Sequence, residues 1–285
     1  MTEIEFLSAL RTLPLHEGAR GLRDDCALIE IGGETLILNH DTMAEGTHFR
    51  PEADPADVAW KLVALNLSDL ASKGAKPIGL LLGHALGRND MRFVSGLREV
   101  LETYQVPLMG GDTIATTGAN TYSITAIGTA TSDPVPSRMA AKPGDAVWMT
   151  GVVGRAMLGF EGVADHLEAF SRPRPLVKQG QSLAPLVHAM MDISDGLLLD
   201  AYRMAEASEV TIAIDSEKVA VADPARRDEC MRWGDDYELL FTMRAGVEPP
   251  VEAMQIGSVE PQGFAPMMLD GHPIMNAEGL GYQHI

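Results

Sequence analysis

Residues 54–86, DPADVAWKLVALNLSDLASKGAKPIGLLLGHAL, decide the fold class. Asp54 is a typical helix N-cap and Pro55 suits the first helical position, while Gly74 and Pro77 mark the end of a long helix. The apolar run that follows at once predicts a buried strand. A long helix leading directly into a strand predicts an α/β layer architecture of the α+β type.

The flanking segments extend this pattern. Upstream, two strands flank Gly32-Gly33, which is the composition of a two-residue hairpin turn. Downstream, the pattern predicts a helix over 89–105 capped by Asn89, and further strands over 106–111 and 122–130. These segments form an N-terminal α/β unit.

A Pro-, Ser- and Gly-rich stretch over 131–145 ends this unit. We therefore expect two domains, an N-terminal α/β domain over 1–135 and a C-terminal α/β domain over 136–285. The strand pattern restarts after the boundary. The second half is predicted to contain helices around 155–168, 178–190 and 196–207, strands at 145–151, 211–214, 237–243 and 253–259, and a hairpin at Asp270-Gly271.

Composition excludes several classes of protein. The chain of 285 residues is 46% hydrophobic and carries a formal charge of -18, with no long basic run, so a nucleic-acid partner is disfavoured. The first residues resemble an amphipathic helix with a Thr2–Glu5 capping box rather than a signal peptide, and no apolar run is long enough to cross a bilayer. Cys26 and Cys230 form no C-x-x-C pattern, which fits a reducing cytoplasm.

Acidic residues stand at the edges of the predicted core elements. In the first hairpin, counting outward from Gly32-Gly33 pairs Asp25 with His40 and Asp24 with Asp41. Like charges directly opposite one another destabilise a sheet unless a cation intervenes. The alternative is that these acids are solvated at the open end of the hairpin.

The long helix carries a second polar position beside the core. Four residues share one stripe at i, i+4, i+7 and i+11, namely Leu62, Asn66, Asp69 and Lys73. A carboxylate on a stripe that begins with an apolar residue usually has a partner.

Two further motifs place acids where strands end. Asp112 follows an apolar strand on a Gly-Gly turn, the end at which α/β proteins commonly bind ligands, although an ordinary Asx turn is an alternative. In MDISDGL, residues 191–197, either Ser194 or Asp195 could cap the next helix. Capping explains one acid of the pair and leaves Asp192 without a role.

Together these acids indicate a metal site. Carboxylates without His or Cys companions suit Mg²⁺, and carboxylates with Mg²⁺ most often serve phosphate chemistry. The chain has no G-x-x-x-x-G-K-[ST] motif, and the glycines of TGVVGRA (150–156) form only a weak phosphate loop. Metal ions would then supply much of the charge that neutralises a nucleotide.

Seven motifs carry a resemblance to a known family. They are GLRDDCALIE, HDTMAEGTHF, LNLSDLASKGAKP, MGGDT, AAKPGD, MDISDGL and WGDDYELLF, and they occur in the order found in thiamine-monophosphate kinases. The match runs from about residue 18 to 245. That family lies within an ATP-dependent superfamily that also contains aminoimidazole ribonucleotide synthetase, selenophosphate synthetase and a hydrogenase maturation protein.

The resemblance implies a fold and a reaction. The fold is the two-domain aminoimidazole ribonucleotide synthetase-like fold, in which the N-terminal sheets of a homodimer join into a barrel and the C-terminal domain is a mixed sheet with helices. The reaction is direct in-line transfer of the γ-phosphoryl group of ATP to thiamine monophosphate, giving thiamine diphosphate, with several Mg²⁺ ions. No phosphoenzyme is expected, and we name no catalytic general base.

The resemblance also implies roles for individual residues. The expected metal ligands are Asp25, Asp41, Asp69, Asp112, Asp192 and Asp195, with Asp24 as the alternative to Asp25. The expected ATP contacts are Gly111, Asp112, Arg138 and Ser194. The expected substrate contacts are His48 and Asp235.

The chain departs from the family pattern at several of these places. It has Asn39-His40 where Ser-Thr is usual, Asp235 where Glu is usual, Arg23 before the paired aspartates in place of Gly, and Gly279 where an aromatic residue is expected. The Arg that often follows the GGDT motif is absent. The alternatives are therefore a same-fold kinase for another small phosphate or alcohol, and a nucleotide-binding paralogue with weak activity.

Overall fold

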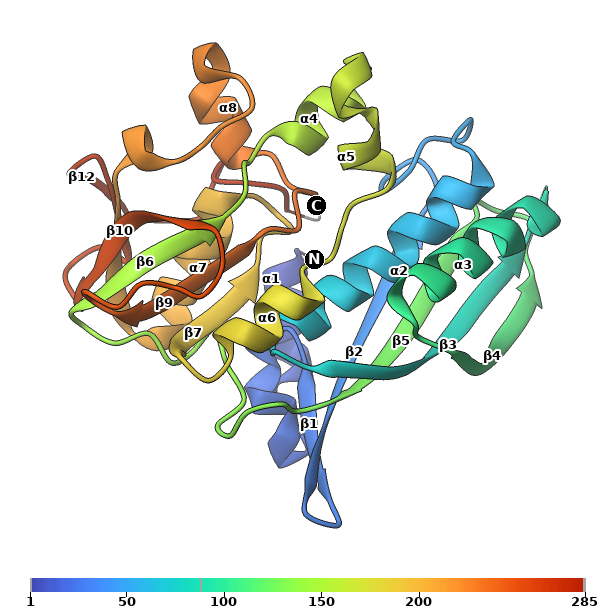
Figure 1. Ribbon diagram of the computed structural model, residues 1–285, viewed down its shortest axis with the longest axis horizontal. Coiled ribbons are helices and arrows are strands. Elements are labelled where there is room, and N and C mark those ends of the chain that lie inside the picture. Colours follow the sequence, from blue (N-terminus) through green and yellow to red (C-terminus); the bar gives the residue numbers. More distant parts are fainter. Residues whose placement is uncertain (1, 88, 284–285) are drawn as a thin grey trace.

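The computed structural model describes residues 2–87 and 89–283, and it contains two sheets (Figure 1). One is five-stranded in the order β1-β2-β5-β3-β4, and the other is seven-stranded in the order β12-β11-β8-β10-β6-β9-β7. The two sheets and their helices confirm the expected α/β class.

The first sheet and its helices come from the N-terminal half. The elements are α1 (Glu3–Leu10), β1 (Ala27–Ile31), β2 (Glu34–Ala44), α2 (Pro55–Ser72), β3 (Lys76–Leu86), α3 (Asp90–Tyr104), β4 (Leu108–Ala115) and β5 (Thr121–Thr129). The pairs β1–β2, β2–β5 and β5–β3 are antiparallel, whereas β3 and β4 are parallel because α3 connects them.

The second sheet comes from the C-terminal half. The elements are β6 (Asp145–Thr150), α4 (Arg155–Phe160), α5 (Leu167–Ser171), α6 (Val177–Leu183), β7 (Val187–Asp192), α7 (Leu197–Ser208), β8 (Val210–Ile214), α8 (Arg227–Arg232), β9 (Leu239–Arg244), β10 (Ala253–Pro261), β11 (Met267–Leu269) and β12 (His272–Ile274). The β11–β12 pair is the hairpin predicted at Asp270-Gly271, where both residues have positive φ.

Helix α2 lies where the two halves meet. Asp54 caps it by accepting a 2.9 Å hydrogen bond from Ala56 N, as predicted. One face of the helix covers the first sheet beside α3, while α6 and the edge strand β7 approach it from the second half (Figure 1). Gln181 of α6 donates to Ala75 O at 2.9 Å, which ties the end of α2 to the C-terminal half.

The first hairpin has the predicted register near its turn but not at its open end. Ile31 pairs with Glu34 and Ala27 with Leu38, as a two-residue turn at Gly32-Gly33 requires. The ladder stops there, so the count that faced Asp24 with Asp41 was wrong. Asp24 turns instead toward the lysine at the end of α2.

Three element predictions were wrong in detail. The helix predicted over 178–190 ends at Leu183, because residues 187–192 pair with β9 as a strand; short apolar runs fit either state. Asn89 precedes α3 in a left-handed conformation and makes no side-chain cap. The apolar strand predicted over 106–111, before Asp112, is β4, which is exposed along its whole length and includes Asp112.

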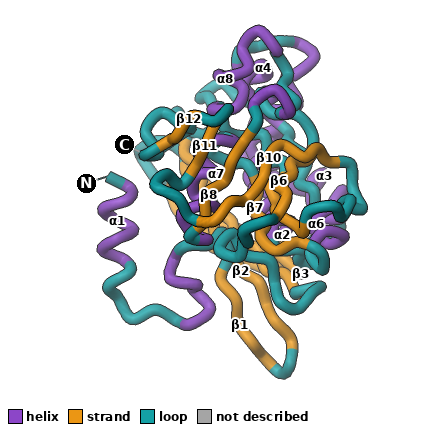
Figure 2. The backbone as a smooth tube through the Cα atoms, turned by 90° about the vertical axis from the view of Figure 1, so that its left-hand side faces the viewer, coloured by secondary structure: helices purple, strands orange, loops and turns teal. Residues whose placement is uncertain are grey.

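The N-terminal helix α1 stands to one side of the molecule (Figure 2). Its capping box is confirmed, because Thr2 Oγ1 accepts from Glu5 N at 3.3 Å and Glu5 Oε2 accepts from Thr2 N at 2.9 Å. Over residues 2–87 and 89–283, no helix is both long and apolar enough to span a membrane.

The close crossing of α2 and α3 gives a stability prediction. A Cβ atom at Gly96 would lie 2.2 Å from Ala56 O and 2.4 Å from its Cα. We expect Gly96→Ala to destabilise the protein by about 1–3 kcal/mol, because the two helices must separate. Urea unfolding measures the change. Gly118→Ala, whose nearest neighbour would be 3.8 Å away, is the matched control; equal effects in both variants would contradict the prediction.

Candidate functional site

Three predicted metal ligands meet where α2 joins the second sheet. Ligand oxygens of Asp25, Asp69 and Asp192 all lie within 4.8 Å of one another. Asp25 precedes β1, Asp69 lies on α2, and Asp192 ends β7. Ser68 Oγ donates to Asp192 Oδ2 at 2.6 Å and so fixes α2 against β7. We call Asp25, Asp69 and Asp192 the acid triad.

Asn39 and Asp41 of β2 border the acid triad. Asn39 Nδ2 donates to Asp69 Oδ2 at 2.8 Å, to Asn66 Oδ1 at 3.1 Å and to Asp41 Oδ2 at 3.4 Å. The Oδ1 atom of Asn39 is buried and has no hydrogen-bond partner. A buried carbonyl oxygen beside carboxylates is a further oxygen ligand for a hard cation.

The electrostatics of the acid triad also favour a cation. Burial, followed by the charges of Asp41 and Asp192, raises the pKa of Asp69 well above its usual range. Burial also raises the pKa of Asp192 to about 7, although the Ser68 hydroxyl opposes the shift. A divalent cation would reverse this effect, because it stabilises the ionised carboxylates. The all-oxygen donor set therefore fits Mg²⁺.

Asp24 has a different environment from Asp25. Its side chain is fully buried and accepts from Arg20 Nη1 at 2.5 Å and from Lys73 Nζ at 2.6 Å. Burial opposes ionisation, but Lys73 and Arg20 outweigh it and lower the pKa of Asp24. Asp25 also contacts Lys73, and it forms an ion pair with Arg138, a predicted ATP contact. Of the two alternatives, Asp25 belongs to the acid triad.

The loop between β7 and α7 carries Ser194, a predicted ATP contact, and Asp195, a predicted metal ligand. Asp200 is buried and its Oδ2 accepts from the backbone nitrogens of Ser194 and Asp195, each at 3.1 Å. Burial, followed by the charge of Asp195, raises the pKa of Asp200 to about 7. Asp195 forms an ion pair with Arg203 and lies outside the acid triad.

Gly111 and Asp112 do not reach the acid triad within one chain. Asp112 pairs with Gly83 of β3, which pairs with Ser123 of β5, which pairs with Thr42 of β2. Three strand spacings separate Asp112 from Thr42 by about 14 Å. A Cβ at Gly111 would lie 1.9 Å from Leu82 O, so glycine is required there by the contact of β4 with β3.

The predicted substrate residues meet at a buried lysine. Lys61 Nζ of α2 donates to Asp235 Oδ2 at 2.8 Å and to His48 O at 3.2 Å. Tyr237 Oη donates to Asp235 Oδ1 at 2.8 Å, and Asp235 N donates to Ser194 O at 2.8 Å. Asp235 therefore links the end of the site with the predicted substrate residues to the loop that follows β7.

Aromatic rings surround this end of the site. Lys61 Nζ lies 3.8 Å from the centre of the Phe170 ring, and Phe160 lies 5.3 Å from both Phe170 and Trp233. These rings come from α4, α5 and the segment after α8. These rings were not predicted from the sequence, because nothing in their spacing links Phe160 and Phe170 to Asp235.

Other site residues were also missed. Lys61 lies on α2 and Lys73 is the C-cap of that helix; both are buried, and a lysine in an apolar helix was the available signal. Asp200 follows three leucines, which gave the same kind of signal. Their partners lie in distant segments and could not be inferred from spacing.

The buried carboxyls predict how stability depends on pH. Asp192 and Asp200 ionise near 3.8 when exposed and at about 7 in the folded, metal-free chain. Because their folded pKa values are raised, their contribution to stability is full below about pH 4 and is lost as the pH rises through about 7. We expect the metal-free melting temperature to fall between about pH 5 and 7, and Mg²⁺ to reduce the fall. Calorimetry with and without Mg²⁺ tests this; a metal-free melting temperature that rises across this interval would contradict it.

Comparisons with known proteins agree with the fold. The family model "AIR synthase related protein, N-terminal domain" matches residues 23–130, and "AIR synthase related protein, C-terminal domain" matches residues 142–263. The chain is therefore an AIR synthase related protein.

Curated relatives define the family within this class. The thiamine-monophosphate kinase of Escherichia coli (strain K12) is 35% identical over 78% of this chain and 76% of its own length. That of Haemophilus influenzae is 30% identical over 92% and 90%. The chain belongs to the thiamine-monophosphate kinase family.

Solved structures of this family have a similar fold. A structure described as "AaThiL complexed with AMPPCP and TMP" has a TM-score of 0.89 and 25% identity, covering 100% of this chain and 97% of the other. The thiamine-monophosphate kinase from Stenotrophomonas maltophilia has a TM-score of 0.78 and 30% identity, covering 95% and 96%.

Proposed function

We propose that this protein transfers the γ-phosphoryl group of ATP to thiamine monophosphate and so forms thiamine diphosphate. Its relatives carry the name of this activity, and a structural relative is described in complex with an ATP analogue and TMP. The observation in this chain that carries the proposal is the acid triad, which gathers three carboxylates beside a predicted ATP contact, Arg138.

The acid triad, with Asp41 beside it, is proposed to hold Mg²⁺. When bound, Mg²⁺ would neutralise phosphate oxygens and screen the repulsion between ATP and the acceptor phosphate. Arg138 and Ser194 are proposed to contact ATP. Asp112 and Asp195 remain predicted ligands, and neither lies within the acid triad.

The acceptor phosphate needs no protein base. The second pKa of a phosphate monoester is about 6, so its oxygen is already a nucleophile near neutral pH. The task of the chain is to hold donor and acceptor in line and to exclude water. The ties of Asp235 to Lys61 and to Ser194 O support this, because they connect the two ends of the site rigidly.

The cluster around Lys61 is proposed to bind the ring part of the substrate. Asp235 and His48 keep their predicted roles, and Phe160, Phe170 and Trp233 offer aromatic faces beside them. These rings would supply the apolar wall that the sequence lacks at Gly279. Ring stacking suits flat heterocycles such as thiazole and pyrimidine.

Purified protein tests the proposal directly. We expect conversion of thiamine monophosphate to thiamine diphosphate that requires both ATP and Mg²⁺. A protein that binds Mg²⁺ and ATP but leaves thiamine monophosphate untouched would instead be a same-fold kinase for another small phosphate or alcohol. Nucleotide binding without any turnover would indicate the weakly active paralogue.

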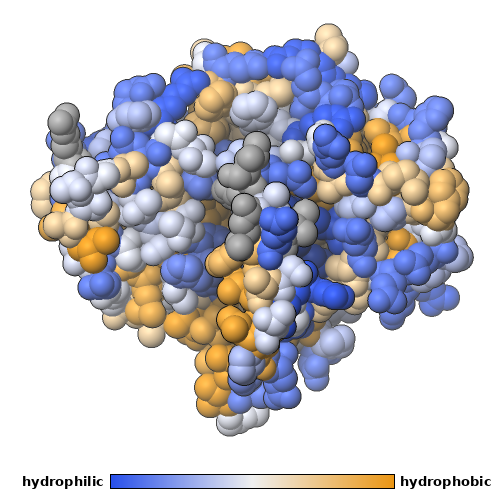
Figure 3. All heavy atoms as spheres, turned by 180° about the vertical axis from the view of Figure 1, so that it is seen from behind, coloured by the Kyte–Doolittle hydropathy of each residue, from blue (hydrophilic) through white to orange (hydrophobic). Residues whose placement is uncertain are grey.

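We further propose a homodimer formed through the open face of the first sheet. Strand β4 is exposed along its whole length, and exposed apolar side chains lie on β3 and β4 at Ile78, Leu81, Leu86, Leu108, Met109 and Ile114. Apolar side chains also gather on the projecting β1–β2 hairpin, where Ile31 is exposed (Figure 3). An exposed apolar sheet face of this extent is usually buried against another protein chain.

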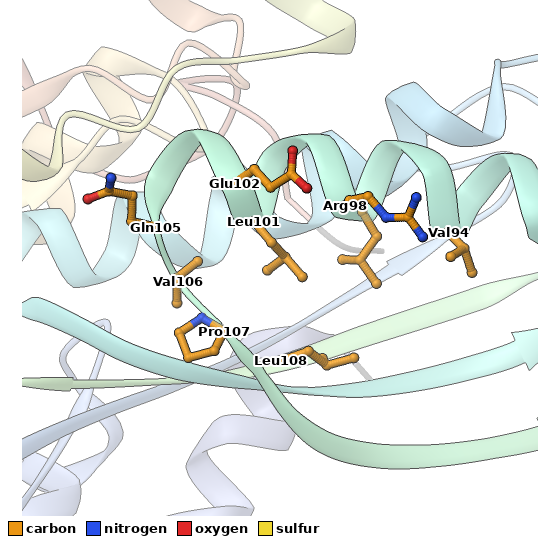
Figure 4. A pocket seen from close by; sticks show the side chains of 9 residues that line it. Val94, Arg98, Leu101, Glu102, Gln105, Val106, Pro107 and Leu108 are labelled. Atoms are coloured by element: carbon orange, nitrogen blue, oxygen red, sulfur yellow. The ribbon is translucent and has the colours of Figure 1, made fainter.

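A groove continues this surface past the edge of the sheet. It has a volume of about 510 Å³ and lies between α3 and the segment that enters β4, with Val94, Leu101 and Leu108 directed into it (Figure 4). Its lining is mainly apolar, and it lacks the carboxylates of the acid triad. We assign it to the proposed dimer surface rather than to catalysis.

One substitution tests the dimer. We expect Met109→Glu to yield a monomer in light scattering, because the introduced charge would be buried against the partner. Phe264→Glu, at a side chain that is more exposed and lies outside the first sheet, should leave the mass unchanged. A wild-type protein that is monomeric at micromolar concentration would overturn the proposal.

Two expectations complete the proposal. We place the domain boundary near residue 135, between β5 and β6. We also propose a cytoplasmic location, which is supported by Cys26 and Cys230 both being buried, free thiols.

A further inference from the structure

The ammonium group of Lys73 places a positive charge inside the site. Its side chain is fully buried, and its Nζ lies 2.6 Å from Asp24 Oδ1, 2.5 Å from Asp25 Oδ2 and 3.3 Å from Met190 O. An ammonium group has three donors, and each has an acceptor here. Lysine is seldom buried in this way unless it is paired.

Among Asp24, Asp25, Asp41, Asp69 and Asp192, the lysine and arginine contacts that the structure describes lie at one end. Lys73, Arg20 and Arg138 all contact Asp24 or Asp25. In the part of the chain that the structure describes, Asp41, Asp69 and Asp192 form no ion pair with lysine or arginine, and Asn39 and Ser68 supply only neutral donors. The Asp24–Asp25 end is thus neutralised by the protein itself, whereas the other end has neutral protein donors and is open to a cation from solution.

We propose that Lys73 takes the place of one divalent cation at the Asp24–Asp25 end of the site. The ammonium lies between two carboxylates in the manner of a bridging metal ion, and it is covalently attached to α2. The site should therefore assemble with one Mg²⁺ fewer than it would need with an uncharged side chain at position 73. This inference rests on the proposed function, because it assumes that Mg²⁺ binds at the acid triad.

Removing the charge should recruit an ion. Lys73→Met leaves Asp24 with Arg20 and Asp25 with Arg138, but it removes the one cation that lies between the two buried carboxylates, which is destabilising unless another cation enters. We expect the metal-free variant to melt at a lower temperature than wild type and Mg²⁺ to restore much of the loss. Lys73→Gln removes the charge but keeps amide donors for the carboxylates, and it provides the same test if Lys73→Met does not fold.

The decisive measurement is the number of Mg²⁺ ions taken up with the nucleotide. Calorimetric titration with AMPPCP, at Mg²⁺ concentrations that span two decades, gives this number as the slope of log apparent affinity against log Mg²⁺ concentration. We expect the slope to rise by about one in both Lys73 variants, which is an extra tenfold in affinity for each tenfold in Mg²⁺. A merely structural role for Lys73 would lower affinity without changing the slope.

Arg92→Met is the control. It removes a cation that pairs with a carboxylate, Asp54, away from the acid triad and from the proposed substrate residues, so its slope should equal that of wild type. An unchanged slope in the Lys73 variants, with wild-type binding that depends on Mg²⁺, overturns the inference and leaves the proposed function standing. Wild-type AMPPCP binding that is independent of Mg²⁺ overturns the metal part of the proposed function, and the inference with it.

Discussion

Asp69→Asn is expected to abolish turnover of thiamine monophosphate and, at the same time, to stabilise the metal-free protein. Asp69 contributes to the acid triad, and losing one carboxylate from a metal centre that stabilises the transferred phosphoryl group should lower kcat by roughly 10³-fold. The stability gain has the opposite sign. Burial and the neighbouring acids raise the pKa of Asp69, and asparagine removes the charge that they oppose.

The two effects separate a functional acid from a structural one. A coupled assay measures kcat, and thermal melting with and without Mg²⁺ measures stability; the variant should melt higher than wild type without Mg²⁺ and gain less from adding it. The exposed Asp165→Asn is the control and should change neither quantity. Retention of more than a tenth of wild-type kcat would remove Asp69 from the proposed mechanism.

Lys61→Met is expected to weaken substrate binding and to destabilise the fold. The side chain is almost wholly buried, and its loss leaves the Asp235 carboxylate without its cation at 2.8 Å. Removing one partner of a buried pair typically costs about 3–5 kcal/mol, and the partial exposure of Asp235 reduces this toward the lower limit. The KM for thiamine monophosphate should rise by roughly tenfold to a hundredfold, because Asp235 and His48 both lose the hydrogen bond that Lys61 donates to them.

A double variant distinguishes the two consequences. Lys61→Met combined with Asp235→Asn removes the unpaired charge, so urea unfolding should recover most of the lost stability while KM stays high. Lys178→Met, at an exposed lysine of α6, should alter neither KM nor stability. Recovery of both quantities in the double variant would mean that Asp235 does not contact the substrate.

Much of the fold could be predicted because local signals agree with the tertiary structure. Asp54 and Pro55 begin α2, and Gly32-Gly33 sets the register of the first hairpin. The errors arose where local signals are ambiguous. The apolar run after Leu183 fits a helix or a strand, and only pairing with β9 decides between them.

The site was predictable as a set of residues but not as an arrangement. The sequence indicated Asp25, Asp69 and Asp192, which the fold brings together. It also grouped Asp112 with them, although β4 and β2 are separated by two other strands. Strand order depends on long-range pairing, and no spacing along the chain reports it.

The buried lysines could not be assigned for a similar reason. Lys61 and Lys73 were visible as charges in an apolar helix, but their partners come from segments up to 174 positions away. Charge pairing across such distances follows from packing and not from local pattern. The contact of Asn39 could not be predicted either. Asn39 was visible in the sequence as a departure from the family pattern, but only the folded chain brings it next to Asp69.

Helix α2 carries both ends of the site on one backbone, with Lys61 at the aromatic cluster and Asp69 in the acid triad. Eight residues of α-helix rise about 12 Å, and this distance hardly stretches or bends. The helix therefore fixes the distance between the position of the acceptor's ring and the position of its phosphate. A molecule is selected by whether its ring and its phosphate span that length. Inserting a single residue between Lys61 and Asp69 would add about 1.5 Å and rotate one end of the site by about 100° relative to the other, so the two ends could no longer face the same acceptor.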